Sequence, residues 1–156
     1  MPIPLTKSHR SQQSTRKGGL TYSLEIRVLT MGGITHRDLW VDNLLFNDNR
    51  LTAILDFDRL RYDYPQLDVA RAVISCALDD DLDVSLASAF IDGYSEERTV
   101  VKGYLTNSLR LLWYMESTWW INATMDQHSV PPARFAEEML WLAENQKNMS
   151  ALLGNI

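Results

Sequence analysis

The stretch that decides the fold reads His36-Arg37-Asp38-Leu39-Trp40-Val41-Asp42-Asn43, and thirteen residues after Asn43 the chain reads Asp56-Phe57-Asp58. Between them lie two short apolar runs, 44–46 and 51–55, separated by Asn47-Asp48-Asn49-Arg50. Asn and Asp favour tight turns, so this arrangement predicts a β-hairpin. Such a hairpin returns Asn43 and Asp56 to the same end of its two strands.

Phosphoryl transfer is the chemistry that these side chains suit. The reaction needs a group that accepts the proton of the attacking hydroxyl, and oxygen ligands that hold magnesium on the phosphates. An Asp in an H-x-D loop can do the first, and an Asn with a second Asp can do the other, because Mg²⁺ prefers hard oxygen ligands. Each residue alone has a structural alternative, since an Asp at a strand end is commonly a turn residue. The ordered combination favours the catalytic interpretation.

These ordered motifs resemble the C-lobe of the aminoglycoside phosphotransferase and choline kinase family, small-molecule kinases related to protein kinases. In that family an H-x-D-x4-N loop is followed by an I-x-D-F/W-D/E strand end and a D-x-A helix start. This chain has His36 to Asn43, Ile54-Leu55-Asp56-Phe57-Asp58 and Asp68-Val69-Ala70, and the resemblance covers about residues 34–153. Trp40 and Asp58 stand where protein kinases typically have Lys and Gly, which favours a small-molecule kinase.

The resemblance implies a role for each motif residue. Asp38 is similar to the catalytic base, and His36 belongs with it as a residue that stabilises the catalytic loop. Asn43 and Asp56 correspond to the magnesium ligands. Asp58 corresponds to the family's second acid and is also assigned as a metal ligand. The implied cofactor is Mg²⁺, the implied co-substrate is ATP, and the acceptor is a small hydroxylated molecule similar to an aminoglycoside, choline or homoserine.

Two further sets of residues are candidates for the site. By resemblance, Asp68 supports the catalytic loop through backbone hydrogen bonds. Trp113, Glu116 and Trp120 recur at i, i+3 and i+7, so they share one helical face. Two indoles around a carboxylate suit a cationic or amino-bearing alcohol. The favoured alternative is that the aromatic stripe is core packing and that Glu116 reaches solvent or an Arg.

The sequence departs from the family before the loop. Only 35 residues precede His36, fewer than the roughly 50 that an independent domain normally has. They contain no G-x-G-x-x-G loop, and neither Lys7 nor Lys17 lies in a V-A-I-K-like strand. We therefore expect the nucleotide-binding lobe to be absent. The alternative to a kinase is then a non-catalytic C-lobe remnant or a partner-binding pseudokinase, and a phosphohydrolase would need a denser set of metal ligands.

The expected fold class is α+β and mainly α: a protein-kinase-like C-lobe around one small hairpin. Gly32-Gly33 is expected to interrupt the chain before the loop. A helix follows Pro65 and ends at the acidic segment 79–81, and Asp83 is the predicted N-cap of the next helix.

The last helices are predicted from charge and apolar spacing. Ser95 with Glu96 and Glu97 is expected to open a long, central helix that reaches about Met125 and is apolar on most sides. Pro131-Pro132 is expected to start the final helix. The buried face of that helix is predicted to contain Phe135, Met139, Leu142, Leu152 and Leu153.

Composition limits the classes of protein. The chain has 156 residues, 46% of them hydrophobic and 22% charged, which is typical of one soluble globular domain. A formal net charge of −5 argues against nucleic acid as a partner. Residues 1–20 contain four basic residues and no acid, so a basic, mobile tail is expected before a C-lobe of residues 21–156.

Cellular context is read from cysteine and from apolar runs. The single Cys76 excludes an intramolecular disulfide and is expected to be a small buried hydrophobe. No run approaches the roughly 18 apolar residues that span a bilayer, and no secretory signal is evident, so no membrane partner and a cytoplasmic location are expected. The surface that meets the missing lobe is expected to favour self-association or a separate N-lobe chain.

Overall fold

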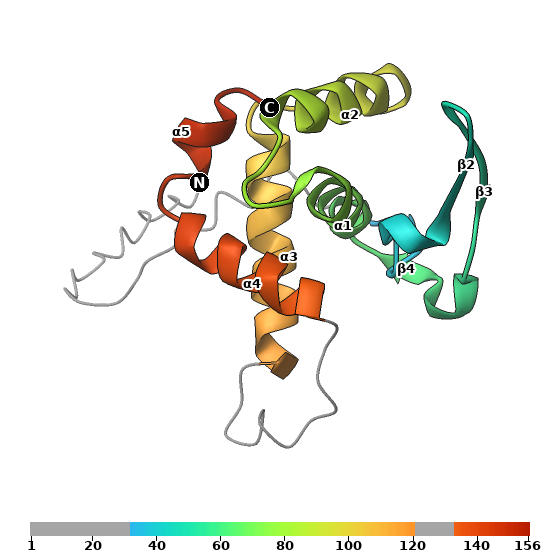
Figure 1. Ribbon diagram of the computed structural model, residues 1–156, viewed down its shortest axis with the longest axis horizontal. Coiled ribbons are helices and arrows are strands. Elements are labelled where there is room, and N and C mark those ends of the chain that lie inside the picture. The colour runs from blue at the N-terminus through green and yellow to red at the C-terminus, as the bar shows by residue number, and fades with distance from the viewer. Residues whose placement is uncertain (1–31, 121–132) are drawn as a thin grey trace, which may run out of the picture.

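The structure, a computed structural model, describes residues 32–120 and 133–156. Two predictions, the basic tail 1–20 and the helix end near Met125, concern residues outside these ranges. For Trp119 and Trp120 the structure describes the backbone but not the side chains. Within them the chain is mainly helical and carries two small antiparallel sheets. This confirms the α+β, mainly α class (Figure 1).

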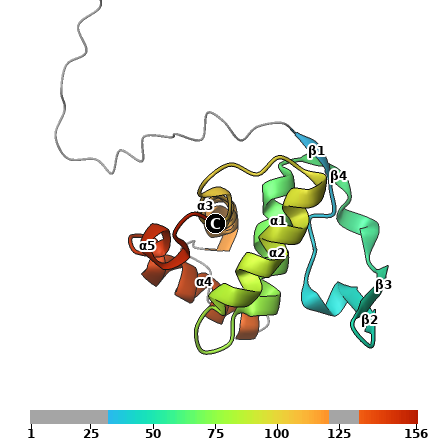
Figure 2. The ribbon, with the colours of Figure 1, turned by 90° about the horizontal axis from the view of Figure 1, so that it is seen from above.

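The predicted hairpin is present. Strand β2 (Leu44–Asn47) pairs antiparallel with β3 (Arg50–Ile54), with Leu44 opposite Ile54 and an irregularity in register between Leu45 and Phe46. The turn residue Asp48 has a φ of 51°, the positive value that two-residue hairpin turns require at their first position. In both Figure 1 and Figure 2 the hairpin lies at the edge of the molecule, away from α4 and α5.

The second sheet was not predicted. Strand β1 (Gly33–Thr35) pairs antiparallel with β4 (Arg61–Asp63). Strands of three residues are too short to show an alternating pattern, and Gly33 starts a strand rather than interrupting the chain. A Cβ on Gly32 would lie 2.5 Å from Tyr62 Cε1, so the missing side chain lets β4 approach. This sheet brings the segment after Asp58 back to His36.

The first two helices follow the prediction closely. Helix α1 (Pro65–Ala77) begins with Pro at its first turn, and α2 (Val84–Glu97) is capped by Asp83, whose Oδ1 accepts a hydrogen bond of 3.0 Å from the Leu86 N–H. The acidic segment 79–81 separates the two helices as expected. The prediction that Cys76 is a small buried hydrophobe was wrong, because its side chain is exposed. Nearly every other residue from 66 to 77 is buried, so Cys76 lies on a face of α1 that the elements of residues 32–120 and 133–156 leave exposed.

The predicted start of the long helix is wrong. Residues 95–97 form the last turn of α2, and α3 (Tyr104–Trp120) begins only after Gly103, which has a φ of 72°. The packed face of α2 reaches the residue directly before Ser95, because Ile91 is buried and the ring of Tyr94 stacks on Tyr104 at 5.8 Å. This packing outweighs the preference of acidic residues for a helix start.

The C-terminal helices are α4 (Ala133–Asn145) and the short α5 (Met149–Leu153). Phe135, Met139 and Leu142 are buried as predicted, and Leu153 is also buried, although it belongs to α5. Leu152 is 36% exposed, so its assignment to the buried face was wrong.

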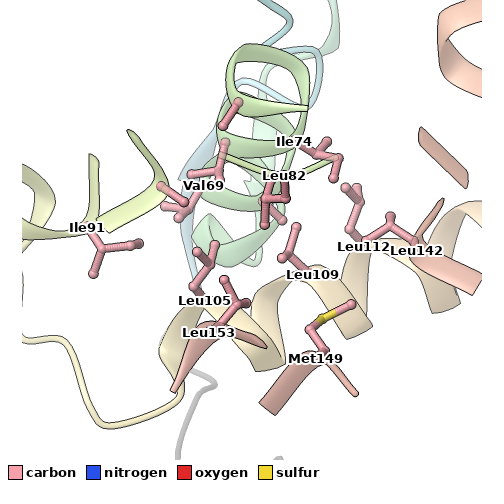
Figure 3. Packing of buried hydrophobic residues seen from close by; sticks show 14 of the residues in the cluster. Val69, Ile74, Leu82, Ile91, Leu105, Leu109, Leu112, Leu142, Met149 and Leu153 are labelled. Atoms are coloured by element: carbon pink, nitrogen blue, oxygen red, sulfur yellow. The ribbon is translucent and has the colours of Figure 1, made fainter. Parts of the chain in front are cut away.

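Helix α3 is central, as expected. It lies between α1 on one side and α4 and α5 on the other (Figure 1). Figure 3 shows Val69 and Ile74 of α1 packed near Leu105, Leu109 and Leu112 of α3. Each fully buried side chain of this kind contributes about 1.5–3 kcal/mol. The other face of α3 is exposed rather than buried, since Tyr114 is 62% exposed. Within the described ranges, every helix is too short or too polar to cross a bilayer.

Candidate active site

Asp68, in the first turn of α1, binds two backbone amides of the loop that follows β1. Its Oδ2 accepts a hydrogen bond from the His36 N–H at 2.6 Å, and its Oδ1 accepts one from the Arg37 N–H at 2.8 Å. Arg37 has a φ of 68°, a sparsely populated conformation that costs about 1–3 kcal/mol for a residue with a side chain. Charge-assisted hydrogen bonds are strong enough to hold this conformation. Asp68 therefore fixes the backbone directly before Asp38.

His36 connects the loop to the end of β3. Its Nε2 lies 2.8 Å from the carbonyl oxygen of Leu55. A carbonyl oxygen only accepts hydrogen bonds, so Nε2 carries the proton in this contact. The ring is buried and packs against Phe57 with 4.9 Å between ring centroids. Nδ1 is also buried and has no hydrogen-bond partner in the described part of the chain. These contacts place His36 between the loop and the end of β3, beside Phe57.

Asn43 closes the loop from the other end. Its Nδ2 donates a hydrogen bond of 2.8 Å to the backbone carbonyl of Asp38, and its own carbonyl accepts one of 2.9 Å from the Leu55 N–H. Further backbone bonds at Trp40 and a single 3₁₀ turn, Val41–Asn43, complete the loop. Since Nδ2 is engaged, Oδ1 is the atom that Asn43 offers to a ligand.

Asp56 follows directly on this junction. It has a φ of 58° and a ψ of 70°, a left-handed conformation that Asp tolerates better than most residues. Its side chain is exposed, and the chain then enters a 3₁₀ turn, Phe57–Arg59. Because Leu55 is hydrogen-bonded both to Asn43 and to His36, the structure brings Asp38, Asn43 and Asp56 to one end of the hairpin.

The donor chemistry at this end suits Mg²⁺. Asn43 and Asp56 offer hard oxygen ligands, and Mg²⁺ is commonly held by one or two protein groups together with waters and substrate phosphates. A dedicated cage is not present: across residues 32–120 and 133–156, no three His, Cys, Asp or Glu side chains are grouped to hold a metal ion. The residues therefore fit a cation that is shared with a phosphate ligand.

An open cavity of about 360 Å³ adjoins Asp38. It is lined by Arg37, Asp58, Arg59, Leu60, Arg61 and Glu116. Arg59 connects the cavity to the loop, because its Nε lies 3.9 Å from Asp38 Oδ2. Asp58 lies on the cavity wall, and its assignment as a metal ligand stays a prediction.

Arg71 is the residue of this region that sequence reasoning missed. It is buried on α1, and its guanidinium carbon lies 4.3 Å from the ring centroid of Trp40, two residues after Asp38. Its NH1 lies 2.9 Å from Glu138 Oε2, and its NH2 lies 3.6 Å from Glu116 Oε1. Burial lowers the pKa of Arg71, while the charges of Glu116, Glu138 and Asp38 oppose that shift. Arg71 thus joins α1, α3 and α4 to the loop that follows β1.

Glu138 is the buried partner of Arg71. Burial raises its pKa to about 7, although Arg71 and Arg134 act in the opposite direction. Its Oε1 makes no hydrogen bond in the described residues, yet Arg134 Nε lies 3.5 Å away. We regard this as a weak ion pair, because 3.5 Å is long for a hydrogen bond. The negative charge of Glu138 is consequently compensated mainly by Arg71.

Of the three residues predicted to contact the acceptor, Trp113, Glu116 and Trp120, only Glu116 lines the cavity in the part of the chain that the structure describes. Glu116 lines the cavity and also lies near Arg71, which is the contact that the structural alternative described. Trp113 is half-buried and packs against the apolar core. The side chain of Trp120 lies outside the described residues. The cavity is bordered by arginines rather than by indoles, so the described residues do not form an aromatic cage around Glu116.

Some of the missed residues carried a signal in the sequence. Arg71 directly follows Asp68-Val69-Ala70, and Arg59 and Arg61 come directly after the Asp56-Phe57-Asp58 motif. Their closeness to the motifs could have marked them as candidates. Glu138 carried no such signal, because it lies 67 residues from Arg71 and only the packing of α4 brings it there.

Comparisons with known proteins agree with this geometry. Residues 25–104 match the family model described as the phosphotransferase enzyme family. A homoserine kinase from Nitrobacter winogradskyi is 34% identical over 71 residues, which are 44% of this chain and 22% of that kinase. The chain therefore spans about a fifth of the length of this relative. None of the solved structures matches the chain.

Proposed function

Because the chain belongs to the phosphotransferase enzyme family, we propose that it takes part in transferring a phosphoryl group from ATP to a hydroxyl group of a small molecule. One observation carries the proposal: the Asn43 side chain is bonded to the Asp38 carbonyl, and the Asn43 carbonyl to the residue before Asp56. These bonds join a base and two oxygen ligands at one end of the hairpin, which is the arrangement that phosphoryl transfer needs.

Asp38 acts as the general base in this proposal. It accepts the proton of the acceptor hydroxyl while the hydroxyl oxygen forms a bond to the γ-phosphorus. The bond between that phosphorus and the bridging oxygen breaks, and ADP leaves with the electron pair. Asp68 and His36 support this step by fixing the loop, and their effect on Asp38 passes through the backbone.

Asn43 Oδ1 and the Asp56 carboxylate are the atoms that would hold Mg²⁺. A magnesium ion at this position supplies charge stabilisation to the phosphate oxygens. The amide orientation of Asn43 favours the assignment, because its NH₂ group is already engaged by the Asp38 carbonyl. The left-handed backbone of Asp56 is a local conformation of the kind found at functional sites.

We further propose that the described residues correspond to the C-lobe of a kinase-like fold. Supporting this, the outer hairpin presents large apolar side chains to solvent: Leu45, Phe46, Leu51 and Ile54 are all at least 37% exposed. Exposed apolar surface of this kind commonly contacts another polypeptide segment. The same observation favours the alternative function, a non-catalytic domain that binds a partner or a second copy of itself.

Thermal unfolding separates these functions. We expect Mg-ATP to stabilise the chain by about 2.7 kcal/mol at a concentration one hundred times its Kd. Asp56→Ala should remove that stabilisation, and Asp80→Ala, which changes an exposed Asp between α1 and α2, should leave it intact. Asp38→Asn should lower phosphoryl transfer by about 10²–10⁴-fold without weakening Mg-ATP binding.

The contrary results are equally distinct. Equal Mg-ATP stabilisation of the wild type and Asp56→Ala would remove Asp56 from the metal site. Stabilisation by magnesium alone, with no dependence on nucleotide, would favour the non-catalytic alternative. In that case light scattering should show self-association through the apolar hairpin.

A further inference from the structure

Trp40 lies between the proposed base and the first proposed metal ligand, and its backbone contacts both. Its N–H donates a hydrogen bond of 2.9 Å to the carbonyl of Asp38, and its own carbonyl accepts one of 2.9 Å from the Asn43 N–H. The Asp38 carbonyl also accepts the hydrogen bond of 2.8 Å from Asn43 Nδ2. A displacement of Trp40 would therefore move both functional residues.

The ring of Trp40 faces a buried cation, the guanidinium group of Arg71. The guanidinium carbon lies 4.3 Å from the centroid of the ring, and only 6% of the Arg71 side chain is exposed. A cation–π contact is stronger when it is desolvated, and the planar guanidinium stacks on an aromatic face in a way that Lys does not. The ring of Phe135 lies 6.0 Å from that of Trp40. The indole is thus attached to helices α1 and α4.

Arg71 can hold this ring because two other helices fix its own position. Its NH1 lies 2.9 Å from Glu138 Oε2 of α4, and its NH2 lies 3.6 Å from Glu116 Oε1 of α3. One turn further along α1, the hydroxyl of Ser75 accepts a hydrogen bond of 3.1 Å from the Val41 N–H. Residues four apart share one face of a helix. One face of α1 therefore holds two successive residues of the loop.

Resting on the proposed phosphotransferase function, we infer that Arg71 is a positioning residue: its contact with the ring of Trp40 holds the loop in the conformation that directs the Asp38 carboxylate to the acceptor hydroxyl. A misplacement of about 1 Å can lower a rate by about 10²-fold, so a contact that only orders the loop can have a large effect on kcat. The charge of Asp38 is among the causes that raise the pKa of Arg71. The buried cation thus also interacts electrostatically with the base.

Steady-state kinetics of ADP formation from Mg-ATP, with water as the acceptor, test the inference on the full chain. Trp40→Leu should lower kcat by about 10–100-fold, because the loop loses its attachment to Arg71. The KM for Mg-ATP should change by less than about threefold, because the hydrogen bond from the Leu55 N–H to the Asn43 carbonyl still holds Asn43 to β3. Trp40→Phe keeps an aromatic face for the cation and should restore most of the lost kcat.

A double-mutant cycle shows whether Arg71 acts through Trp40. Arg71→Met is combined with Glu138→Leu, so that Glu138 is not left buried without its main cation. This charge-free variant should also lose about 10–100-fold in kcat. Adding Trp40→Leu to it should lower kcat by less than about twofold more, because two residues that act through one contact are not additive.

Trp141 provides the matched control. It is another half-buried indole that packs against the core, and its Nε1 donates a hydrogen bond of 3.0 Å to Asp81 Oδ1, away from the loop. Trp141→Leu should lower the Tm and leave kcat unchanged. An equal loss of kcat in Trp141→Leu and Trp40→Leu would overturn the inference, because lower stability would then explain both.

Hydrogen exchange reports on the loop without turnover. The amides of residues 40 and 43 should exchange at least about tenfold faster in Trp40→Leu and in the charge-free variant, because opening of the loop becomes easier. Their exchange should be unchanged in Trp141→Leu. Circular dichroism identifies the variants that are folded. If Trp40→Leu does not fold, the charge-free variant decides the matter by its own kcat and amide exchange.

The contrary results separate this inference from the proposed function. Wild-type kcat in a folded Trp40→Leu or in the charge-free variant, additive losses in the cycle, or unchanged exchange at the two amides would each overturn the positioning role of Arg71. Faster exchange at these amides, in a chain whose wild type forms no ADP, would overturn the phosphotransferase proposal alone, because Arg71 would still order the loop.

Discussion

The helical part of the molecule and its β part are held together in different ways. Helices α1, α3 and α4 share an apolar core in which Ile74, Leu105 and Leu142 are fully buried. In residues 33–63 most large apolar side chains are exposed, including Phe46 at 58% and Tyr62 at 73%. The candidate site lies on this weakly packed part and is tied to the helices by a few polar contacts. Functional loops are commonly drawn from such low-stability regions, because they must admit ligands.

The largest expected effect comes from Arg71, which contacts Glu138 within the helical part and the ring of Trp40 in the β part. Arg71→Met should destabilise the chain by about 3–5 kcal/mol, because it leaves Glu138 buried without its main cation. The double variant Arg71→Met with Glu138→Leu should recover most of this loss, since it removes the buried charge as well. Urea unfolding of both variants measures the difference. A loss below about 1 kcal/mol in the single variant would show that Glu138 is already compensated by other groups.

The pH dependence of stability should show the next largest effect. The pKa of Glu138 is about 7 in the folded state and 4.5 as its ordinary value. A raised pKa means that the favourable contribution is present below about 4.5 and is lost as the pH rises through 7. Glu138→Gln should therefore gain about 2–3 kcal/mol relative to the wild type between pH 4.5 and 7.5. Thermal unfolding across this range tests it, and parallel curves for the two proteins would contradict it.

Asp68 connects the helical part to the β part through two hydrogen bonds, so changing it should have the smallest and most local effect. Asp68→Asn should weaken the bonds to the His36 and Arg37 amides by about 2 kcal/mol in total, so hydrogen exchange at these amides should accelerate by more than tenfold. Exchange at Leu109, in the centre of α3, should stay slow. Asp83→Asn is the matched control, because it affects the capped Leu86 amide instead. Unchanged protection of the two loop amides would mean that Asp68 does not hold the loop.

The sequence predicted the local features well. The hairpin between Asn43 and Asp56, the N-cap at Asp83 and the buried face with Phe135 and Met139 all follow from turn residues, capping chemistry and apolar spacing. These features depend on neighbours within a few residues, which sequence patterns report directly. The prediction failed at residues 95–97, where acidic side chains indicated a helix start but the packing of Tyr94 continued α2.

The long-range contacts of the site were beyond the sequence. Nothing in the pattern indicated that Glu138 meets Arg71 across 67 positions, or that Arg61 reaches the loop by pairing β4 with β1. Such contacts depend on the angles and distances between packed elements, and single-sequence periodicity carries no information about them.

The order and spacing of its motifs therefore determined the family of this protein and the identity of Asp38, Asn43 and Asp56 as candidates. Those depend on residue types along the chain and on one tight hairpin. Only the tertiary structure decided which charges surround them: the arginines of the cavity, the buried Arg71 and its partner Glu138. The physical reason is that charge interactions depend on distance and burial, and folding alone brings side chains remote in sequence within a few ångströms in a low-dielectric interior.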